Sequence, residues 1–524
     1  MQNRGEVVIQ RLSLLYHTIL RHYSTNQGYL KSACKIAAAS YVIYSGIQKL
    51  YVAFFGPLSK VPGPFVAKFM GLPSLIYDMP TGTLFASLKK LHDIHGAIVR
   101  TGPKSISVAD KDMIKQILVH DDLPKGPIYA FLRKSGETML STENREVHKK
   151  KRKMAAHAFS IKYLNSLEPY MKSVSKSMID QVQKDIQSTI DEEGYGTVDL
   201  WRIMSCTALD IIGETAFGET FHMLEDGTHP IPKLVMLRMK LGAYVAAYPA
   251  FLKMFIKGPN PKIINFVKGI YEKRIGSGEK RDDILQAMVD MQNDSDPEKC
   301  MTTRDLVRET FLFLTAGSDT TGNTLGFALI ELLRNPDKME KLHQEIDTLA
   351  FMEGTELFYN GQLKALPYLN GVIHETLRLC PVPGVGLQRR TEKEINLRGE
   401  LVLPKDITVT ANLYHAHNNN AYWPNASKFI PERWIPGEDA YNQVIDHDCL
   451  FTFSAGSRNC IGKNFALQEL RLALANFFKY YAIKPIPKEM EEANNLRQYI
   501  TLTVAKGSFL AKVKRRTEAP LSAL

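Results

Sequence analysis

Cysteine is scarce and scattered in this chain, and several common ligand-binding patterns are missing. The six cysteines among 524 residues form no Cys-x-x-Cys pair and no disulfide-rich pattern, which suits a reducing compartment. The chain has no Gly-x-Gly-x-x-Gly fingerprint and no P-loop, so flavin and nicotinamide are not expected to bind to it directly. His374-Glu375 lacks the second histidine of a zinc-protease helix. These absences argue against a disulfide scaffold, a dinucleotide-binding domain and a zinc protease of that type.

The composition is that of a globular protein with an excess of positive charge. Hydrophobic residues make up 44% of the chain and charged residues 23%, values that argue against a disordered or fibrous protein. The formal net charge of +11 calls for an anionic partner. The basic residues are dispersed and no nucleic-acid module is recognisable, so we expect a membrane surface or an acidic protein rather than nucleic acid.

Residues 1–56 are expected to form a membrane anchor with a flanking basic segment. Ile36–Phe55 is mostly apolar, and a helix of this length spans about 30 Å, the thickness of a bilayer core. Gln48 and Lys49 weaken this interpretation, because a charge at depth costs a few kcal/mol. Two alternatives stay open: an anchor in the endoplasmic reticulum membrane with a cytosolic body, or a basic presequence leading to the mitochondrial inner membrane. The first is favoured, because Pro57–Pro64 forms a stiff, proline-rich spacer.

Residues 57–524 are expected to form one mainly helical body with small β-sheets. Hydrophobic periodicity predicts helices over Ile114–Val119, Tyr170–Ile190 and Leu306–Leu333. Strand-like runs are Ala97–Arg100, Ser105–Val108, Arg398–Pro404, Thr501–Val504 and Ser508–Val513, the first two forming a hairpin. Leu234–Lys257 is expected either to touch a membrane or to close the core.

The most informative segment is residues 453–462, Phe-Ser-Ala-Gly-Ser-Arg-Asn-Cys-Ile-Gly, which we call the cysteine loop. Its glycines let the backbone run close under a flat macrocycle without Cβ clashes. The apolar helix that follows Cys460 points backbone N–H groups and its positive dipole end at the sulfur, which favours a thiolate. Arg458 is placed to meet a haem propionate, and Phe453 to cover the sulfur. These features predict that Cys460 binds haem iron.

The cysteine loop resembles a known family signature. It matches the Phe-x-x-Gly-x-Arg-x-Cys-x-Gly motif of the cytochrome P450 monooxygenases at every fixed position, ending at Gly462. The similarity extends from about Pro57 to about Lys514, and the proline-rich hinge is similar to that of fungal microsomal members. The resemblance implies a cytochrome P450 fold, haem b (iron protoporphyrin IX) as cofactor, and Cys460 as the axial thiolate ligand.

A second constellation lies in the middle of the longest predicted helix. Ala316–Thr321 places glycine and threonine where they are locally unfavourable, which indicates a role beyond helix stability. The resemblance implies that this stretch crosses the distal face of the haem. Gly317 would leave room for dioxygen and let the helix open locally. Thr320 would donate to the bound oxygen, and Asp319 would help deliver protons from solvent.

The third constellation is structural. Glu375 and Arg378 lie at i and i+3, and Arg433 follows in the segment Phe-Ile-Pro-Glu-Arg-Trp. Together they resemble the Glu–Arg–Arg triad of the family. The resemblance implies that this triad locks the loop that presents the cysteine and is not catalytic.

A basic run, His148–Lys153, completes the motifs. The family places a Trp-x-x-x-Arg motif here, whose two residues donate to a haem propionate. This chain has His148 in place of the tryptophan, with Arg152 four residues on. Because an imidazole N–H makes the same hydrogen bond, both residues are expected to bind a propionate. The flanking lysines are expected on the proximal face, where an acidic electron donor docks.

The resemblance implies a membrane-bound monooxygenase. It would take electrons from NADPH through NADPH-cytochrome P450 reductase, with cytochrome b5 as a further donor, and insert one atom of O2 into a lipophilic substrate. Steroid hydroxylation is the first expectation, and fatty-acid or xenobiotic hydroxylation is the alternative. The candidate pocket residues are mostly apolar: Tyr129, Phe131, Phe313, Ala316, Val382, Val385 and Leu502.

Two rival functions remain at this stage. One is a non-oxygenating isomerase or dehydratase of the same family, and the other is a haem-binding sensor or electron carrier without turnover. The first often lacks the acid–alcohol pair, so Asp319 and Thr320 argue against it. The same pair and the basic run argue against the second.

Overall fold

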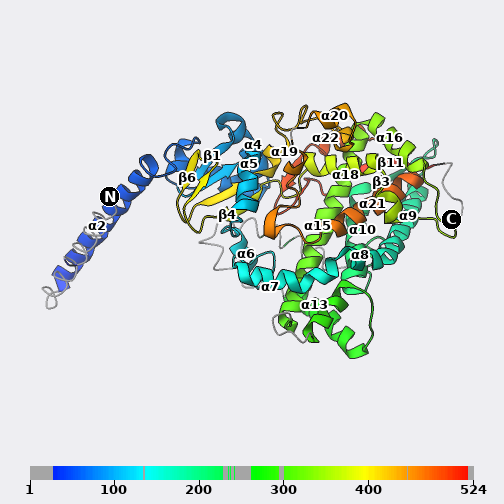
Figure 1. Ribbon diagram of the computed structural model, residues 1–524, viewed down its shortest axis with the longest axis horizontal. Coiled ribbons are helices and arrows are strands. Elements are labelled where there is room, and N and C mark those ends of the chain that lie inside the picture. The colour runs from blue at the N-terminus through cyan, green and yellow to red at the C-terminus, as the bar shows by residue number, and fades with distance from the viewer. Residues whose placement is uncertain are drawn as a thin grey trace.

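The computed structural model describes residues 27–133, 136–227, 261–293, 300–444 and 446–516, together with Leu14, Leu234, Leu237 and Leu241. Almost all of Leu234–Lys257, for which a membrane contact is one expectation, lies outside the described residues. The described chain forms a mainly helical body from which the N-terminal helix α2 projects as an arm (Figure 1).

Helix α2 runs from Gln27 to Phe54, and its apolar side chains, such as Tyr41 and Val42, are exposed. Among the described helices, none is long and apolar enough to cross a membrane. The prediction of a spanning helix at Ile36–Phe55 is therefore not supported. Polar positions interrupt the apolar run; the Gln48 amide donates to the Tyr44 hydroxyl at 2.8 Å along the same helix.

The centre of the body is the helix α15, Thr303–Arg334, which is buried along most of its second half. The side chain of Thr302 caps its start by accepting from the Asp305 N–H at 3.1 Å. Helix α10, Leu200–Ile212, packs closely along it because α15 has small residues at the crossing. A Cβ at Gly326 would lie 2.5 Å from the Trp201 ring.

Some of the remaining helices pack around this pair, and others, such as α4 and α5, lie beside the mixed sheet (Figure 1). They are α3 Pro73–Thr81, α4 Leu84–His95, α5 Lys111–Lys115, α6 Tyr129–Arg133, α7 Arg145–Ala156, α8 Ile161–Ser166, α9 Glu168–Thr189, α13 Pro261–Ser277, α14 Ile284–Asp290, α16 Pro336–Asp347, α17 Asn360–Leu363, α18 Pro367–Leu379, α19 Leu413–His417, α20 Asp439–Asn442, α21 Lys463–Tyr480 and α22 Pro487–Glu492. The helices predicted over Tyr170–Ile190 and Leu306–Leu333 are thus confirmed as α9 and α15.

The predicted helix Ile114–Val119 differs from the structure. Helix α5 ends at Lys115, and a π-helical turn, η2, follows over Gln116–His120. The wider turn ends with the Asp121 N–H donating to Gln116 O at 2.8 Å. It brings the backbone of Leu118 against the cysteine loop, so the departure from α-helix serves a tertiary contact.

The largest described sheet is mixed, with the order β1-β2-β7-β4. Strands β1 (Ile98–Gly102) and β2 (Ser105–Val108) form the predicted hairpin. Strand β2 pairs in parallel with β7 (Thr408–Ala411), which pairs antiparallel with β4 (Leu387–Arg390). This sheet joins the N-terminal and C-terminal parts of the chain, and its members pack around a core separate from that of α15.

Three smaller sheets complete the described fold. Their strands are β3 Gly196–Asp199, β11 Leu510–Arg515 and β8 Tyr481–Lys484 in one, β5 Ile395–Leu397 and β6 Leu401–Leu403 in the second, and β9 Leu496–Gln498 and β10 Leu502–Val504 in the third. Within the predicted strand Arg398–Pro404, only Leu401–Leu403 forms a strand, β6. The runs Thr501–Val504 and Ser508–Val513 form strands of different sheets, β10 and β11.

Candidate active site

The cysteine loop lies between the buried sheet core and the start of helix α21. The Cys460 N–H donates to Phe453 O at 2.8 Å, which closes the loop on itself. Ser454 and Gly456 both have positive φ, 57° and 71°. A Cβ at Gly456 would lie 2.0 Å from Leu118 O of the π-helical turn, so only glycine fits there. The thiol of Cys460 is accessible.

Two arginines hold the cysteine loop from the side. Arg152 of α7 donates to Asn459 O at 2.7 Å and to Asn459 Oδ1 at 2.5 Å, directly beside the cysteine. Arg458 donates to Thr142 O at 2.8 Å and to Glu143 O at 3.0 Å. Both arginines were expected at the haem propionates, and the structure brings both to the loop that carries the cysteine.

A cluster of buried cationic side chains lies close to the cysteine. Lys125 is 5% exposed and Arg389 of β4 is 1% exposed, and among the described residues no carboxylate pairs with either. Burial, with Arg389 and Arg458 nearby, holds the pKa of Lys125 well below its usual range. An uncompensated buried cation is costly unless an anion joins it. Sequence reasoning missed Lys125 and Arg389, because single basic residues in a loop and a short strand carry no spacing signal.

The same cluster includes His148 of α7, which is 6% exposed. Burial, with Arg458, Lys125 and Arg152 nearby, lowers the pKa of His148 to about 4. Its imidazole is therefore neutral at physiological pH and retains one N–H donor. The Cys460 thiol thus lies beside several cationic side chains and hydrogen-bond donors, and few carboxylates offset their charge. This arrangement fits a macrocycle that carries a metal and two carboxylates.

The surroundings of Cys460 shift the pKa of its thiol in both directions. Although Cys460 is exposed by surface area, its thiol is closely surrounded by protein atoms, and this desolvation raises its pKa, while the Gly462 N–H, Arg152 and Lys125 act in the opposite direction. The chain thus supplies hydrogen-bond and cationic support for a thiolate, and coordination to a metal would complete the deprotonation.

Helix α15 approaches this site through aromatic packing. The rings of Phe159 and Phe313 lie 5.1 Å apart, and Phe159 is 4.0 Å from the position of a Cβ at Gly462. Phe159 therefore bridges the cysteine loop and α15. The expected local opening of α15 is not seen, because the helix is continuous from Thr303 to Arg334.

The acid and alcohol predicted on α15 both lie within the continuous helix. Thr320 Oγ1 donates to Ala316 O at 2.6 Å, one turn earlier. Asp319 is half-buried, and desolvation raises its pKa to about 6. A carboxyl with this pKa exchanges protons near neutrality, as a general acid must.

A second buried acid lies beneath this turn. Glu469 of α21 is 1% exposed, and neither carboxyl oxygen has a described hydrogen-bond partner. Burial raises its pKa well above 4.5, opposed by the nearby Thr321 hydroxyl. Burial therefore favours the protonated form of this carboxyl. Sequence reasoning missed it, because a single glutamate in an apolar helix looks like a surface position.

The structural triad is assembled as expected. Glu375 accepts from Arg378 through two bonds, at 2.9 Å and 2.7 Å, and from Arg433 Nε at 3.2 Å. The Trp434 indole and the Ile430 N–H also donate to Glu375, both at 3.0 Å. Arg378 continues to the carbonyl of His417, whose imidazole accepts from the Phe451 N–H at 3.0 Å. A rigid chain of contacts thus runs from α18 to the residues just before the cysteine loop.

Comparison with known proteins agrees with this geometry. A family model described as Cytochrome P450 matches residues 61–511. The chain belongs to the cytochrome P450 family.

Named relatives of this cytochrome P450 are fungal enzymes. The chain is 32% identical to cytochrome P450 monooxygenase acrD of Aspergillus aculeatus, over 86% of this chain and 89% of the relative. It is also 32% identical to cytochrome P450 monooxygenase FUS8 of Gibberella fujikuroi, over 91% and 92%. Cytochrome P450 monooxygenase LUC2 of a Fusarium species is 31% identical over 88% and 90%. The chain is therefore a haem-thiolate monooxygenase, and its cofactor is haem iron.

The basic run of this P450 is not uniformly exposed. Lys149, Lys150 and Lys153 are exposed, but Lys151 is buried. Its ammonium group lies 2.9 Å from Asp305 and 3.1 Å from Glu309 of α15. The expectation that all the flanking lysines face an electron donor is wrong for Lys151, which instead ties α7 to α15.

The predicted pocket residues divide into two groups. Phe313, Val382 and Leu502 are buried in the main core, with exposures of 5%, 4% and 0%. Ala316 is exposed, and Val385 and Tyr129 are half-buried, with the Lys125 ammonium 4.4 Å from the Tyr129 ring. The side chain of Phe131 lies outside the described residues.

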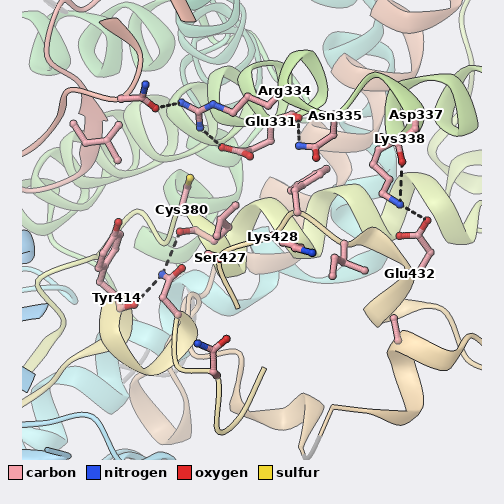
Figure 2. Close-up of a pocket in the computed structure, with 18 of the residues that line it drawn as sticks. Glu331, Arg334, Asn335, Asp337, Lys338, Cys380, Tyr414, Ser427, Lys428 and Glu432 are labelled. Atoms are coloured by element: carbon pink, nitrogen blue, oxygen red, sulfur yellow. Dashed lines mark hydrogen bonds and ion pairs between the residues drawn. The ribbon is translucent and has the colours of Figure 1, made fainter. Parts of the chain in front are cut away.

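A separate surface cavity of about 1080 Å³ lies away from the cysteine. Figure 2 shows its charged lining: Arg334 pairs with Glu331 at 2.5 Å, and Lys338 bridges Asp337 and Glu432. Neither the thiol of Cys460 nor the Asp319–Thr320 turn contributes to the lining. We therefore regard it as a structural cleft between α15, α16 and α19.

Proposed function

We propose that this cytochrome P450 monooxygenase is membrane-associated and inserts one atom of O2 into a lipophilic substrate, with a steroid as the leading substrate class. The observation that carries the proposal is the accessible Cys460 thiol beside a buried, uncompensated cationic cluster, with Asp319 and Thr320 on the neighbouring helix. Those features supply a ligand, a cradle and a proton source in one place.

The haem-holding residues follow from charge and position. Cys460 is the ligand to iron, and Lys125, His148, Arg389, Arg152 and Arg458 are the donors available to the two propionates. When bound, the haem supplies dioxygen binding and activation at its iron. Lys125 is the strongest candidate for direct contact, because Arg152, Arg458 and Arg389 already donate to backbone carbonyls.

Asp319 and Thr320 of α15 then take part in proton transfer. Below a pH of about 6 the Asp319 carboxyl holds a proton, and above it the carboxylate can accept one from solvent. The Thr320 hydroxyl, now donating to Ala316 O, retains two acceptor lone pairs and can orient a water or a neighbouring acid. Asp319 and Thr320 are neighbours in the chain and point in different directions from α15, so a bound water would have to carry a proton from the carboxyl to the hydroxyl.

The substrate class is supported by the polarity of the accessible pocket positions. Ala316 and Val385 offer no charge or hydrogen bond from their side chains, which suits an apolar molecule that is oriented by shape. The Asn323 amide donates to Leu502 O at 2.9 Å, so α15 also fixes strand β10 at the pocket edge. A rigid apolar steroid matches these features, with a fatty acid or xenobiotic as the alternative.

The partners we propose follow from charge and exposed apolar surface. Lys149, Lys150 and Lys153 form an exposed basic row on α7, suited to acidic NADPH-cytochrome P450 reductase and cytochrome b5. The exposed apolar side chains of α2 continue in Phe55 and Phe65, 75% and 66% exposed. We propose that they rest on the cytosolic face of the endoplasmic reticulum membrane.

The test combines binding and turnover. Purified holoenzyme is titrated with steroids, fatty acids and planar xenobiotics, and the shift in haem absorption is recorded. Binding compounds are then incubated with NADPH, reductase and isotope-labelled dioxygen. We expect at least one steroid to bind and to gain one labelled oxygen atom. Binding and oxygen insertion confined to fatty acids or xenobiotics would reject the steroid class, and binding without any incorporation would favour the sensor or electron-carrier function.

A further inference from the structure

The cysteine loop is tied to a distant segment by one short contact that the haem chemistry does not require. Ser457 Oγ lies 2.8 Å from Asp122 Oδ1 and 2.7 Å from Asp122 Oδ2. The hydroxyl carries one proton, so it donates to one carboxylate oxygen at a time. The two residues are 335 positions apart in the chain, which makes this a tertiary contact between two loops.

Asp122 is held in an unusual backbone conformation. Its φ is 42°, a left-handed value that non-glycine residues rarely adopt. Such conformations persist where the surrounding contacts over-determine them. The adjoining π-helical turn supplies one of these contacts, because Leu118 O fills the space beside Gly456. Arg145 Nη1 adds a weaker interaction, 3.9 Å from Asp122 Oδ2.

The segment that contains Asp122 also supplies the buried cation of the haem cradle. Lys125 follows three residues later, and Pro124 O accepts from the Arg390 N–H at 3.0 Å on strand β4. From helix α7, Arg152 donates two hydrogen bonds to Asn459, the residue before the cysteine. The residues just before Cys460 are therefore clamped from two directions, by Asp122 at Ser457 and by Arg152 at Asn459.

We propose that Asp122 is a positioning residue for the haem ligand. Its hydrogen bond with Ser457 holds the cysteine loop so that Cys460 Sγ stays at the distance and orientation that keep the thiolate on iron. Through the short connection to Lys125, it also keeps the ligand and the propionate cradle in register. The inference rests on Cys460 as the haem ligand and assigns no chemical step to Asp122.

The expected effect is on the ligation state rather than on folding. Because this bond is exposed to solvent, we take the low end of what a hydrogen bond to a charged group contributes, which corresponds to about a tenfold change in an equilibrium or rate. Without the bond, we expect the reduced carbon monoxide complex to lose its red-shifted, thiolate-ligated band about tenfold faster than wild type at the same temperature. The reduction potential of the haem should shift in the same variants, because the sulfur environment changes.

The variants separate the hydrogen bond from backbone strain and from charge. Asp122→Gly removes the carboxylate while tolerating the positive φ, and Ser457→Ala removes the donor from the other side. Asp122→Asn keeps an acceptor oxygen and also tolerates the left-handed conformation. Asp121→Asn is the matched control, because Asp121 accepts from Gln116 Nε2 at 3.0 Å and, within the described part of the chain, makes no hydrogen bond or ion pair with the cysteine loop.

We expect Ser457→Ala and Asp122→Gly to accelerate loss of the band equally, their combination to add nothing, and Asp122→Asn to stay within about twofold of wild type. Asp121→Asn should match wild type. Wild-type behaviour of Ser457→Ala overturns the proposal even if Asp122→Gly fails to fold. Additive effects in the double variant, or an Asp122→Asn variant as labile as Asp122→Gly, also overturn it. A wild-type protein that never shows the band refutes instead the haem-thiolate assignment.

Discussion

Replacement of Lys151 by methionine tests how the buried ion pair holds α7 against α15. Lys151 and Glu309 have side-chain exposures of 9% and 1%, and their charged groups lie 3.1 Å apart. Removing one member of a buried pair leaves the other charge uncompensated, which costs about 3–5 kcal/mol. Two N–H···O contacts from Met139, at 3.0 and 3.2 Å, remain on Glu309. We therefore expect Lys151→Met to lose about 3 kcal/mol of unfolding free energy, at the low end of that range.

The loss should depend on pH with a definite sign. Burial already raises the pKa of Glu309, opposed chiefly by Lys151, so the variant should raise this pKa further. A carboxyl whose native pKa exceeds its unfolded value gives stability that is complete below the unfolded pKa and is lost as pH rises through the native one. The deficit of Lys151→Met relative to wild type should therefore shrink on acidification.

Denaturant unfolding of the ferric holoenzyme, followed by tryptophan fluorescence at neutral pH and at about pH 5, measures both effects. Lys150→Met is the matched control, since Lys150 is exposed on the same helix, and it should change stability by less than about 0.5 kcal/mol. Glu309→Gln added to Lys151→Met should recover a large part of the loss. If Lys151→Met is no less stable than Lys150→Met at neutral pH, the buried pair does not hold the two helices together.

Four further outcomes follow from the site. Cys460→Ala should abolish the red-shifted band of the reduced carbon monoxide complex, and its survival would refute the ligand assignment. Thr320→Ala should keep substrate binding and NADPH consumption while hydrogen peroxide rises and product falls, by about 10²-fold if acid–base assistance is lost; wild-type coupling would make Thr320 only a helix residue. Glu469→Gln should remove a fall in unfolding free energy that wild type shows as pH rises from 4.5 towards the raised native pKa, and identical pH dependence of stability in the two proteins would contradict the raised pKa of Glu469. Deletion of residues 1–56 should leave a haem-binding protein. The deletion removes the Ala53 carbonyl that accepts from buried Arg100, but Arg100 keeps its hydrogen bond to the Leu58 carbonyl at 3.0 Å. Failure to bind haem would show that the boundary lies elsewhere.

The parts of the fold that the sequence predicts are those with strong local patterns. Helices α9 and α15 follow from long hydrophobic periodicities, and the β1–β2 hairpin from two short apolar runs around a turn. The triad could be predicted because its acid and one arginine share a helix face, and the second arginine lies in a recognisable segment. Strands β10 and β11 were found, but their assignment to different sheets depends on distant partners that no local pattern reveals.

The basic run shows why local patterns mislead about burial. On a helix, residues three and four apart share a face, so His148 and Lys151 turn inward together while Lys149 and Lys150 turn outward. The sequence shows six consecutive basic residues, His148–Lys153, and suggests a uniformly solvated surface. Only the acidic residues of α15, more than 150 positions away, make an inward lysine favourable.

The order of strands in the mixed sheet constrains how this enzyme is made. Strand β2 ends at Val108, and its parallel partner β7 begins at Thr408, so about 300 residues must be synthesised before the pair can form. At a synthesis rate of about 5–20 residues per second, strand β2 of the hairpin stays without its partner β7 for about 15–60 s. Cys460 emerges later still, after Lys125, His148 and Arg389. Cofactor capture is therefore a late event of biosynthesis, and the nascent N-terminal portion needs protection from aggregation until the C-terminal part arrives.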